Sequence, residues 1–211
     1  MTYQMDHMPR MLRIGLTGPT GAGKGTAAAA FSRFGVPSID TDKVYHDLLI
    51  PPSACLDELV RRFGEGILQP DGTLNRRALA VRVFDEGDER DHDDLNKITH
   101  KYVLDMVRAC CAGLEKAGVR AVLVDAPLLY ESGFDKECGR VLAVLADADV
   151  RRARIMARDG ISEAQAQSRM DAQQPDGYYI AGADEVIYND GDPSLLAEAA
   201  ATVLKKWGVI A

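Results

Sequence analysis

The stretch GLTGPTGAGKGTAAAAF, from Gly15 to Phe31, decides the fold. Inside it the pattern G-x-x-x-x-G-K runs from Gly18 to Lys24. In such a loop the glycines let backbone N–H groups point at phosphate oxygens, and the lysine reaches the β- and γ-phosphates. The apolar run LRIGLT precedes the loop and an alanine-rich helical run follows it. This order of strand, loop and helix favours a nucleotide site over a glycine-rich turn that only joins two elements.

The loop departs from the usual pattern at one position. A hydroxyl residue that binds Mg²⁺ normally follows the lysine, but here Gly25 follows and Thr26 comes next. The GAGKGT ending resembles that of adenylate and cytidylate kinases. We therefore expect Thr26 to bind phosphate or Mg²⁺, with the metal held largely through water and phosphate oxygens. Asp125 in VLVDAP is the second candidate for the metal or its waters, unless it merely ends a strand.

Composition bounds the class of protein. The chain has 211 residues, 46% hydrophobic and 27% charged, which fits one globular domain with a substantial core. The net charge of −7 argues against binding to nucleic acid, because such binding needs a basic face. The four cysteines have no C-x-x-C spacing and predict reduced thiols.

No targeting or membrane segment is evident from the sequence. The N-terminus lacks the apolar core of a signal peptide, and no segment approaches about 18 uninterrupted apolar residues. We expect a cytoplasmic protein that binds no membrane. Because Met5, Met8 and Met11 precede the first periodic segment, residues 1–10 are either a frayed leader or a mis-assigned start.

Short β-branched runs alternate with helical patterns along the chain, which is typical of a parallel sheet covered by crossover helices. The fold class is α/β, with three layers (α/β/α) around a five-stranded parallel sheet. Strands are expected at 12–17, 37–40, 120–127, 140–147 and 184–190, and helices at 24–34, 53–63, 75–84, 93–116 and 193–207.

Two long gaps between strands predict insertions in a single chain with a core of 11–40, 119–149 and 184–211. The gap of about 80 residues between the second and third strands predicts a helical acceptor-binding insert at about 41–118. Residues from about 150 to 183 predict a helical lid, so that two inserts form movable walls of a cleft. The charged run DEGDERDHDD (85–94) is interpreted as a solvated connection in preference to a metal site.

Two carboxylates follow the second strand. Asp40 and Asp42 lie two residues apart at a carboxyl strand end, where ligand sites of open α/β sheets occur. One of them is suited to accept the proton of an attacking hydroxyl. The alternative is that one of them caps the helix that begins in KVYHDLL, and both roles are compatible.

From about Leu12 to Trp207 the chain resembles the dephospho-coenzyme A kinase family. The resemblance rests on six segments in order: FGVPSIDTDKV, DGTLNRRAL, NKITH, DAPLLYESG, RRARIMARDGISEAQAQSRMDAQ and ADEVIYNDGD. It implies an ATP-dependent phosphotransferase that phosphorylates the 3′-hydroxyl of dephospho-coenzyme A, with Mg²⁺ as cofactor. The alternatives are a nucleoside-monophosphate kinase or an ATP-binding module without an acceptor. The oligomeric state is not indicated.

The resemblance also implies roles for single residues. Asp42, Arg154 and Lys24 are the expected catalytic residues, with Asp42 as the base and Arg154 on the transferring phosphoryl group. The expected ATP-binding residues are Gly18, Pro19, Thr20, Gly21, Ala22, Gly23, Lys24, Gly25, Thr26, Arg154, Asn189 and Gly191. The expected acceptor-binding residues are Asp40, Asp42, Arg76, His100, Leu128 and Glu131, and the metal candidates are Thr26 and Asp125, through water.

Some of these assignments have a competing structural interpretation. The family usually has proline after the histidine of NKITH, whereas this chain has Lys101, so His100 either lies inside a longer helix or contacts the acceptor. Arg158 either assists Arg154 or packs against the lid. For Arg151 and Arg152 we expect a solvated helical face. Glu131 is alternatively a carboxylate at a helix start, and NDGD a simple turn.

Overall fold

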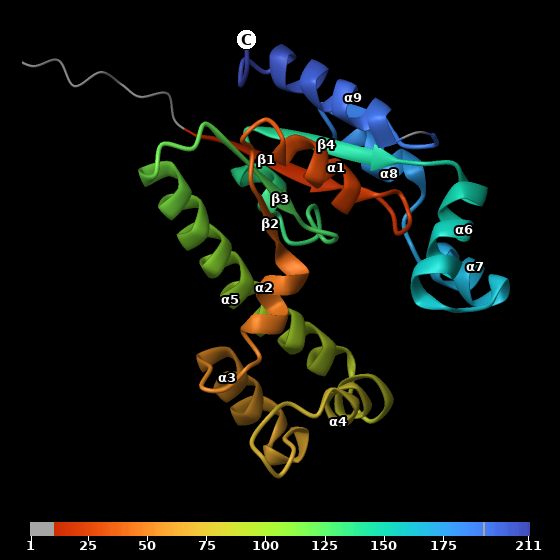
Figure 1. The fold of residues 1–211 in the computed structure, drawn as a ribbon. Helices are drawn as coiled ribbons and strands as arrows, with labels where there is room; N and C mark the ends of the chain where they lie inside the picture. The colour runs from red at the N-terminus through yellow and green to blue at the C-terminus, as the bar shows by residue number, and fades with distance from the viewer. Residues whose placement is uncertain (1–10, 192) are drawn as a thin grey trace, which may run out of the picture. The chain divides into compact units, whose positions relative to one another are not determined.

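The computed structural model describes residues 11–191 and 193–211, so the question of residues 1–10 lies outside the described residues. Five strands form one parallel sheet in the order β2-β3-β1-β4-β5 (Figure 1). They are β1 (Leu12–Thr17), β2 (Ser38–Asp40), β3 (Ala121–Asp125), β4 (Arg140–Leu145) and β5 (Glu185–Tyr188). β1 therefore lies between β3 and β4, and its carboxyl end is where an open sheet of this kind binds ligands.

Helices fill the connections between the strands. They are α1 (Lys24–Ser32), α2 (Thr41–Asp47), α3 (Ala54–Phe63), α4 (Arg76–Ala80), α5 (Glu89–Lys116), α6 (Ala148–Asp159), α7 (Glu163–Asp171), α8 (Asp176–Ala181) and α9 (Pro193–Lys206). Short 3₁₀ segments lie at η1 (Glu65–Ile67) and η3 (Phe134–Glu137), and a π-helical turn, η2 (Val81–Asp85), continues α4.

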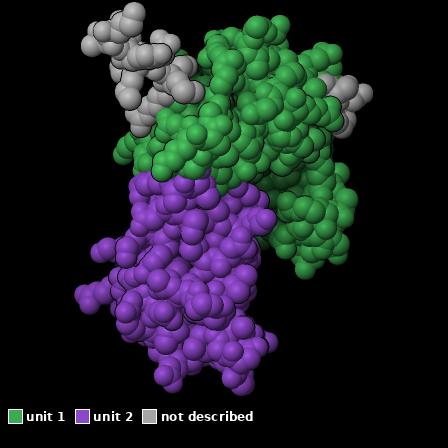
Figure 2. Space-filling view, turned by 60° about the vertical axis from the view of Figure 1, so that its left-hand side comes forward, with its two compact units in different colours: residues 1–39, 111–211 green, residues 40–110 purple. Residues whose placement is uncertain are grey.

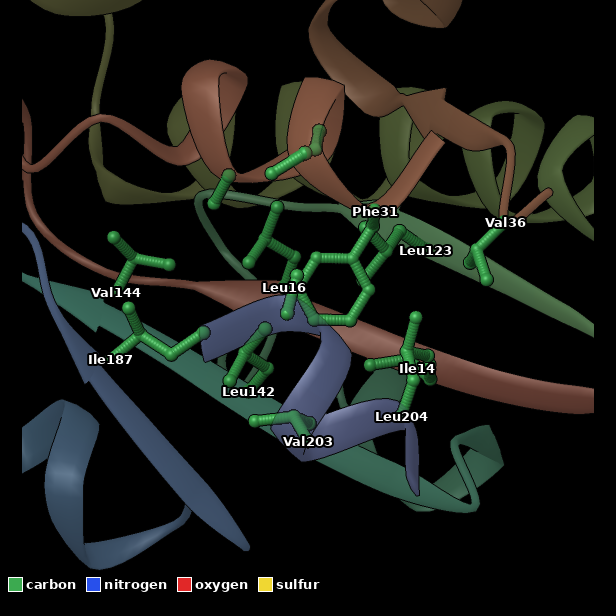
Figure 3. Close-up of a cluster of buried hydrophobic side chains, with 14 of the residues drawn as sticks. Ile14, Leu16, Phe31, Val36, Leu123, Leu142, Val144, Ile187, Val203 and Leu204 are labelled. Carbon is green, nitrogen blue, oxygen red and sulfur yellow. The ribbon is translucent and has the colours of Figure 1, made fainter. Parts of the chain in front are cut away.

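The main hydrophobic core lies between the sheet and the pair α1 and α9 (Figure 3). Phe31 of α1 is fully buried among side chains of β1, β3, β4 and α9. Burying one such ring contributes about 1.5–3 kcal/mol. β3 and β4 are buried along nearly their whole length, because helices cover both faces of a parallel sheet.

The opposite face of the sheet is covered by different elements. Tyr179 of α8 packs on Ala143 and Leu145 of β4. Together with the layer of α1 and α9, this cover gives the three-layer α/β/α arrangement that the alternating pattern predicts.

The chain divides into two compact units, coloured separately in Figure 2. Unit 1 comprises residues 1–39 and 111–211, and unit 2 comprises residues 40–110. The described part of unit 1 holds the sheet and residues 150–183, the expected lid. Unit 2 has its own core, in which Leu59 and Phe63 of α3 pack with Leu79 and Val83.

The charged run 85–94 corrects one expectation. It is not a solvated connection throughout, because α5 begins at Glu89, four residues before the expected start. Asp88 accepts hydrogen bonds from the N–H groups of Arg90 and Asp91, at 2.9 and 3.1 Å. The run thus contains a helix start with a side-chain cap.

Asp91 itself is 6% exposed. It accepts hydrogen bonds from Arg62 Nη2 at 2.5 Å and Arg82 Nη1 at 2.8 Å. The hydrogen bond from Arg82 lowers the pKa of Asp91, its burial opposes this, and the bond from Arg62 adds to the lowering. The buried carboxylate of this run is thus held by ion pairs with two arginines. No group of three or more His, Cys, Asp or Glu side chains that could hold a metal ion occurs among the described residues.

The expected lid is a set of three helices, α6, α7 and α8. Gly160, in the left-handed region at φ 64°, ends α6. Ser162 and Gln165 then form a capping box that starts α7. Turn and cap residues thus divide a segment whose composition predicts only helix.

Candidate nucleotide and acceptor site

The loop between β1 and α1 has the geometry of an anion site. Gly23 precedes α1 with φ 93°, and a β-carbon at this position would collide with the Asn189 amide. The first backbone hydrogen bond of α1 runs from Ala27 N–H to Gly23 O at 3.0 Å. The N–H groups of Lys24, Gly25 and Thr26 therefore precede the helical ladder, and with the helix dipole they favour bound phosphate.

Lys24 is held beside this loop. Its Nζ donates to Gly18 O at 3.0 Å, across the loop from its own position. The half-buried ammonium group thus lies at the site expected for phosphate, where it is suited to neutralise the anion.

Two further side chains contact the loop backbone. Arg154 on α6 directs its Nη1 toward Gly21 O and Ala22 O, at 3.4 and 3.5 Å. Asn189, which follows β5 and is 6% exposed, donates from Nδ2 to Ala22 O at 2.8 Å. The structure therefore brings both predicted residues to the nucleotide loop, although the Asn189 side chain serves the protein backbone.

The other arginines of α6 differ in their surroundings. Arg151 is not on a solvated face, which corrects that expectation: it is 7% exposed and its Nη1 bonds Asp176 Oδ1 at 2.9 Å. Arg152 is half-buried beside Gln167. Arg158 is bonded through both Nε and Nη2 to Asp159, which raises the pKa of Arg158.

Asp125, the carboxylate expected to bind the metal, lies beside β1, the strand that leads into the nucleotide loop. Asp125 ends β3, and Leu16 of β1 is its partner in register. Thr26 is exposed in the first turn of α1. Thr26 and Asp125 offer oxygen donors of the kind that Mg²⁺ prefers, and Mg²⁺ commonly takes most of its ligands from phosphates and water.

The predicted acceptor residues of unit 1 follow β3. Leu128 is 50% exposed, so its side chain is available for a ligand. Glu131 is exposed and accepts a hydrogen bond from Tyr178; burial raises the pKa of Tyr178, and this hydrogen bond adds to the effect.

The remaining acceptor candidates belong to unit 2. Asp40 caps α2, since its Oδ1 accepts from Lys43 N–H at 3.0 Å, and Asp42 is exposed in the first turn of that helix. Arg76 Nη2 lies 2.5 Å from His46 Nδ1. His46 was not among the residues predicted from the sequence to belong to the site. The fold of unit 2 brings it into contact with Arg76.

His100 lies well inside α5, which supports the helical alternative for this residue. Lys101 allows the helix to continue where the family usually has proline. Its ammonium group lies 3.4 Å from Glu58 Oε2 and 4.7 Å from the centre of the Tyr102 ring.

A glutamine that the sequence did not single out also contacts the loop. Gln173, between α7 and α8, accepts a hydrogen bond from Thr20 N–H at 2.8 Å. Gln173 lies in one of the segments that resemble the family. No rule of sequence spacing predicts a contact between two residues that are 153 positions apart.

A phosphate loop between β1 and α1, a carboxylate ending the neighbouring strand and an arginine from the helix after β4 define the class of P-loop kinases. The family model described as dephospho-CoA kinase matches residues 12–194. The chain therefore belongs to the dephospho-CoA kinase family.

Individual relatives agree with this membership. A protein of Corynebacterium efficiens named dephospho-CoA kinase is 40% identical over 181 residues, which are 86% of this chain and 90% of that protein. The structure of TT1252 from Thermus thermophilus is 31% identical, covers 93% of this chain and 98% of its own, and has a TM-score of 0.78. Dephospho-CoA kinase from Campylobacter jejuni shares the fold, with a TM-score of 0.67 at 23% identity over 92% of this chain and 96% of its own.

Proposed function

We propose that the protein transfers the γ-phosphoryl group of ATP to the 3′-hydroxyl of dephospho-coenzyme A, the last step of coenzyme A synthesis. The family match over residues 12–194 carries the proposal, because it includes both the nucleotide loop and all of unit 2. Binding of ATP is further supported by the phosphate loop with its free helix N-terminus and by Lys24 beside it.

On the nucleotide side the chain supplies positioned positive charge. The N–H groups at the start of α1 and the ammonium group of Lys24 hold the triphosphate. The Arg154 guanidinium stabilises the charge that develops on the transferring phosphoryl group, for which its planar set of donors is suited. An Mg²⁺ ion bound through phosphates, water, Thr26 and Asp125 would supply further neutralisation of the phosphate oxygens.

On the acceptor side we assign the base to Asp42. Asp40 already caps α2 through its carboxylate, whereas Asp42 is exposed and has no hydrogen-bond partner among the described residues. Asp42 would orient the acceptor hydroxyl and take its proton. We assign Arg76, His100, Leu128 and Glu131 to contacts with the rest of the acceptor, and Gly191 with Asn189 to the adenine side of ATP.

The protein is proposed to work in the cytoplasm. None of its four cysteines forms a disulfide, which suits a reducing compartment. No helix of the described residues is long and apolar enough to cross a membrane. The proposed small-molecule partners are ATP and dephospho-coenzyme A.

An acceptor panel tests this function. ADP release is measured with dephospho-coenzyme A, AMP, CMP and shikimate, with Lys24→Ala as the inactive control. We expect turnover with dephospho-coenzyme A alone. Turnover with CMP or AMP would instead support a nucleoside-monophosphate kinase, as the GKGT ending suggests, and ATP binding without turnover on any acceptor would support a non-catalytic module.

The position of phosphorylation needs a second measurement. Analogues of dephospho-coenzyme A that lack either the 2′- or the 3′-hydroxyl of the ribose are compared in the same assay. The 2′-deoxy analogue should react and the 3′-deoxy analogue should not. The opposite pattern would exclude the proposed 3′-hydroxyl.

A further inference from the structure

The segment from Gln173 to Asp176, which joins α7 to the first residue of α8, is fixed at two points, and the roles proposed above explain neither of them. Gln173 Oε1 accepts the hydrogen bond of Thr20 N–H at 2.8 Å. Three residues later, Asp176 Oδ1 accepts from Arg151 Nη1 at 2.9 Å, and the Arg151 side chain is 8% exposed. One short segment is therefore attached both to the nucleotide loop and to the start of α6.

Thr20 occupies a defined position in the loop. Ala22 N–H donates to Pro19 O at 3.3 Å, which closes a turn over Pro19–Ala22. Gly21, the third residue of this turn, has φ 77°, as a type II turn requires there. The N–H of Thr20, the second residue, is not used by the turn and is bonded by Gln173 instead.

The same turn packs tightly against α6. A β-carbon on Gly21 would lie 2.7 Å from Arg151 O and 3.0 Å from Arg151 Cα. The turn, the first residues of α6 and the segment 173–176 thus form a closed set of contacts. A shift of this segment would move the turn, and α6 carries Arg154 to Gly21 O and Ala22 O.

We infer that Gln173 is a positioning residue for ATP, which acts through Thr20 to fix the loop turn in the form that receives the phosphates. Arg151 and Asp176 hold the segment from which Gln173 reaches the loop. This inference rests on the proposed function only in that ATP is the nucleotide bound. The acceptor plays no part in it.

The test compares Gln173→Met with the neighbouring Gln174→Met as a matched control. Methionine keeps the length of the side chain but removes the amide oxygen, and Gln174 is exposed with no hydrogen-bond partner among the described residues. The dissociation constant of Mg²⁺-ATP is measured by calorimetry in the absence of any acceptor, beside the KM values for both substrates and the melting temperature without nucleotide.

Loss of one such hydrogen bond should raise the ATP dissociation constant about 2- to 13-fold in Gln173→Met. Gln174→Met should bind ATP as the unaltered protein does, and KM for dephospho-coenzyme A should stay unchanged in both variants. Unaltered ATP affinity in Gln173→Met, or a lower melting temperature as its only effect, overturns the inference.

A second variant removes the other partner of the bond. Thr20→Pro deletes the N–H, and proline is common at the second position of a type II turn. When Gln173→Met is combined with Thr20→Pro, the double variant should bind ATP as weakly as Thr20→Pro alone. If the two losses of ATP affinity add, Gln173 acts through a contact other than the Thr20 N–H. Because ATP binding needs no acceptor, failure of dephospho-coenzyme A to react would refute the proposed function and leave this test intact.

Discussion

Replacement of Gly25, the residue that stands in place of the usual hydroxyl, should stabilise the protein. Gly25 is the second residue of α1, and its φ is not among the positive values of the described glycines. A β-carbon placed on it meets no atom within 4 Å. Alanine or serine therefore fits without strain, and either side chain reduces the conformational freedom of the unfolded chain.

The size of the effect follows from these observations. Gly→Ala at a compatible position contributes about 0.4–1 kcal/mol, and serine contributes less because its helix propensity is lower. For a chain of this length such a gain corresponds to a rise of about 1–4 °C in melting temperature. Urea and thermal unfolding of Gly25→Ala without nucleotide provide the measurement. A lower free energy of unfolding would refute the argument from open space around residue 25.

The same pair of variants tests the metal. Gly25→Ser supplies the hydroxyl that most such loops offer to Mg²⁺, while Gly25→Ala adds only the β-carbon. If the hydroxyl binds the metal, the Mg²⁺ concentration for half-maximal ADP release should fall about 2- to 13-fold in the serine variant alone, as one polar contact permits. Equal Mg²⁺ dependence in the two variants would show that no metal ligand acts from position 25. Thr26→Ala should impair use of Mg²⁺-ATP more than binding of ATP.

Further results are expected for the catalytic candidates, for two thiols and for Asp91. Asp42→Asn or Arg154→Ala should lower turnover about 10²–10³-fold with an unchanged circular dichroism spectrum, and near-normal activity would remove that residue from the catalytic set. Burial raises the pKa of Cys55 to about 11 and of Cys138 to about 12, so at pH 8 iodoacetamide should label both only after unfolding. In the unfolded chain these thiols ionise near pH 9, below their pKa values in the folded protein. Their contribution to the free energy of unfolding is therefore present below pH 9 and is lost as the pH rises toward the folded-state pKa values. A free energy of unfolding that stays constant over this pH range would contradict the two raised pKa values. Asp91→Asn should lower the melting temperature at pH 7. Since hydrogen bonds from arginines lower the pKa of Asp91 below 3.8, this difference should vanish as the pH falls through that pKa, and a difference that persists in strong acid would point to packing instead.

The sheet could be predicted because its strands are buried on both faces. Such strands contain few polar residues, so they stand out in the sequence as short apolar runs. β1 has its expected bounds, and β3 and β4 lie within theirs. The loop could be predicted because its chemistry is local: glycines, a lysine and a helix start lie within ten residues of one another. Residues 148–181 were harder, since caps at Gly160 and Ser162 divide one long helical pattern into separate helices.

Burial of charge could not be predicted from local pattern. Arg151 lies in a run of arginines that has the composition of a solvated face, and its partner Asp176 is 25 residues away. Asp91 lies in a run of acids, while its partner Arg62 comes from another helix. Such pairs depend on tertiary packing, and the local sequence pattern around either member does not reveal which distant residue it contacts. The same holds for Gln173 and Thr20.

The helical insert has a consequence for how this enzyme class diversifies. Unit 2 begins where β2 ends and the chain returns through α5 to β3, and β2 and β3 are neighbours in the sheet. Unit 2 is therefore one enlarged crossover between adjacent strands. Such a crossover can be lengthened or exchanged while β1, its loop and α1 keep their hydrogen bonds. Members of this class can thus differ in unit 2 through changes in one connection, while the nucleotide loop of unit 1 stays the same.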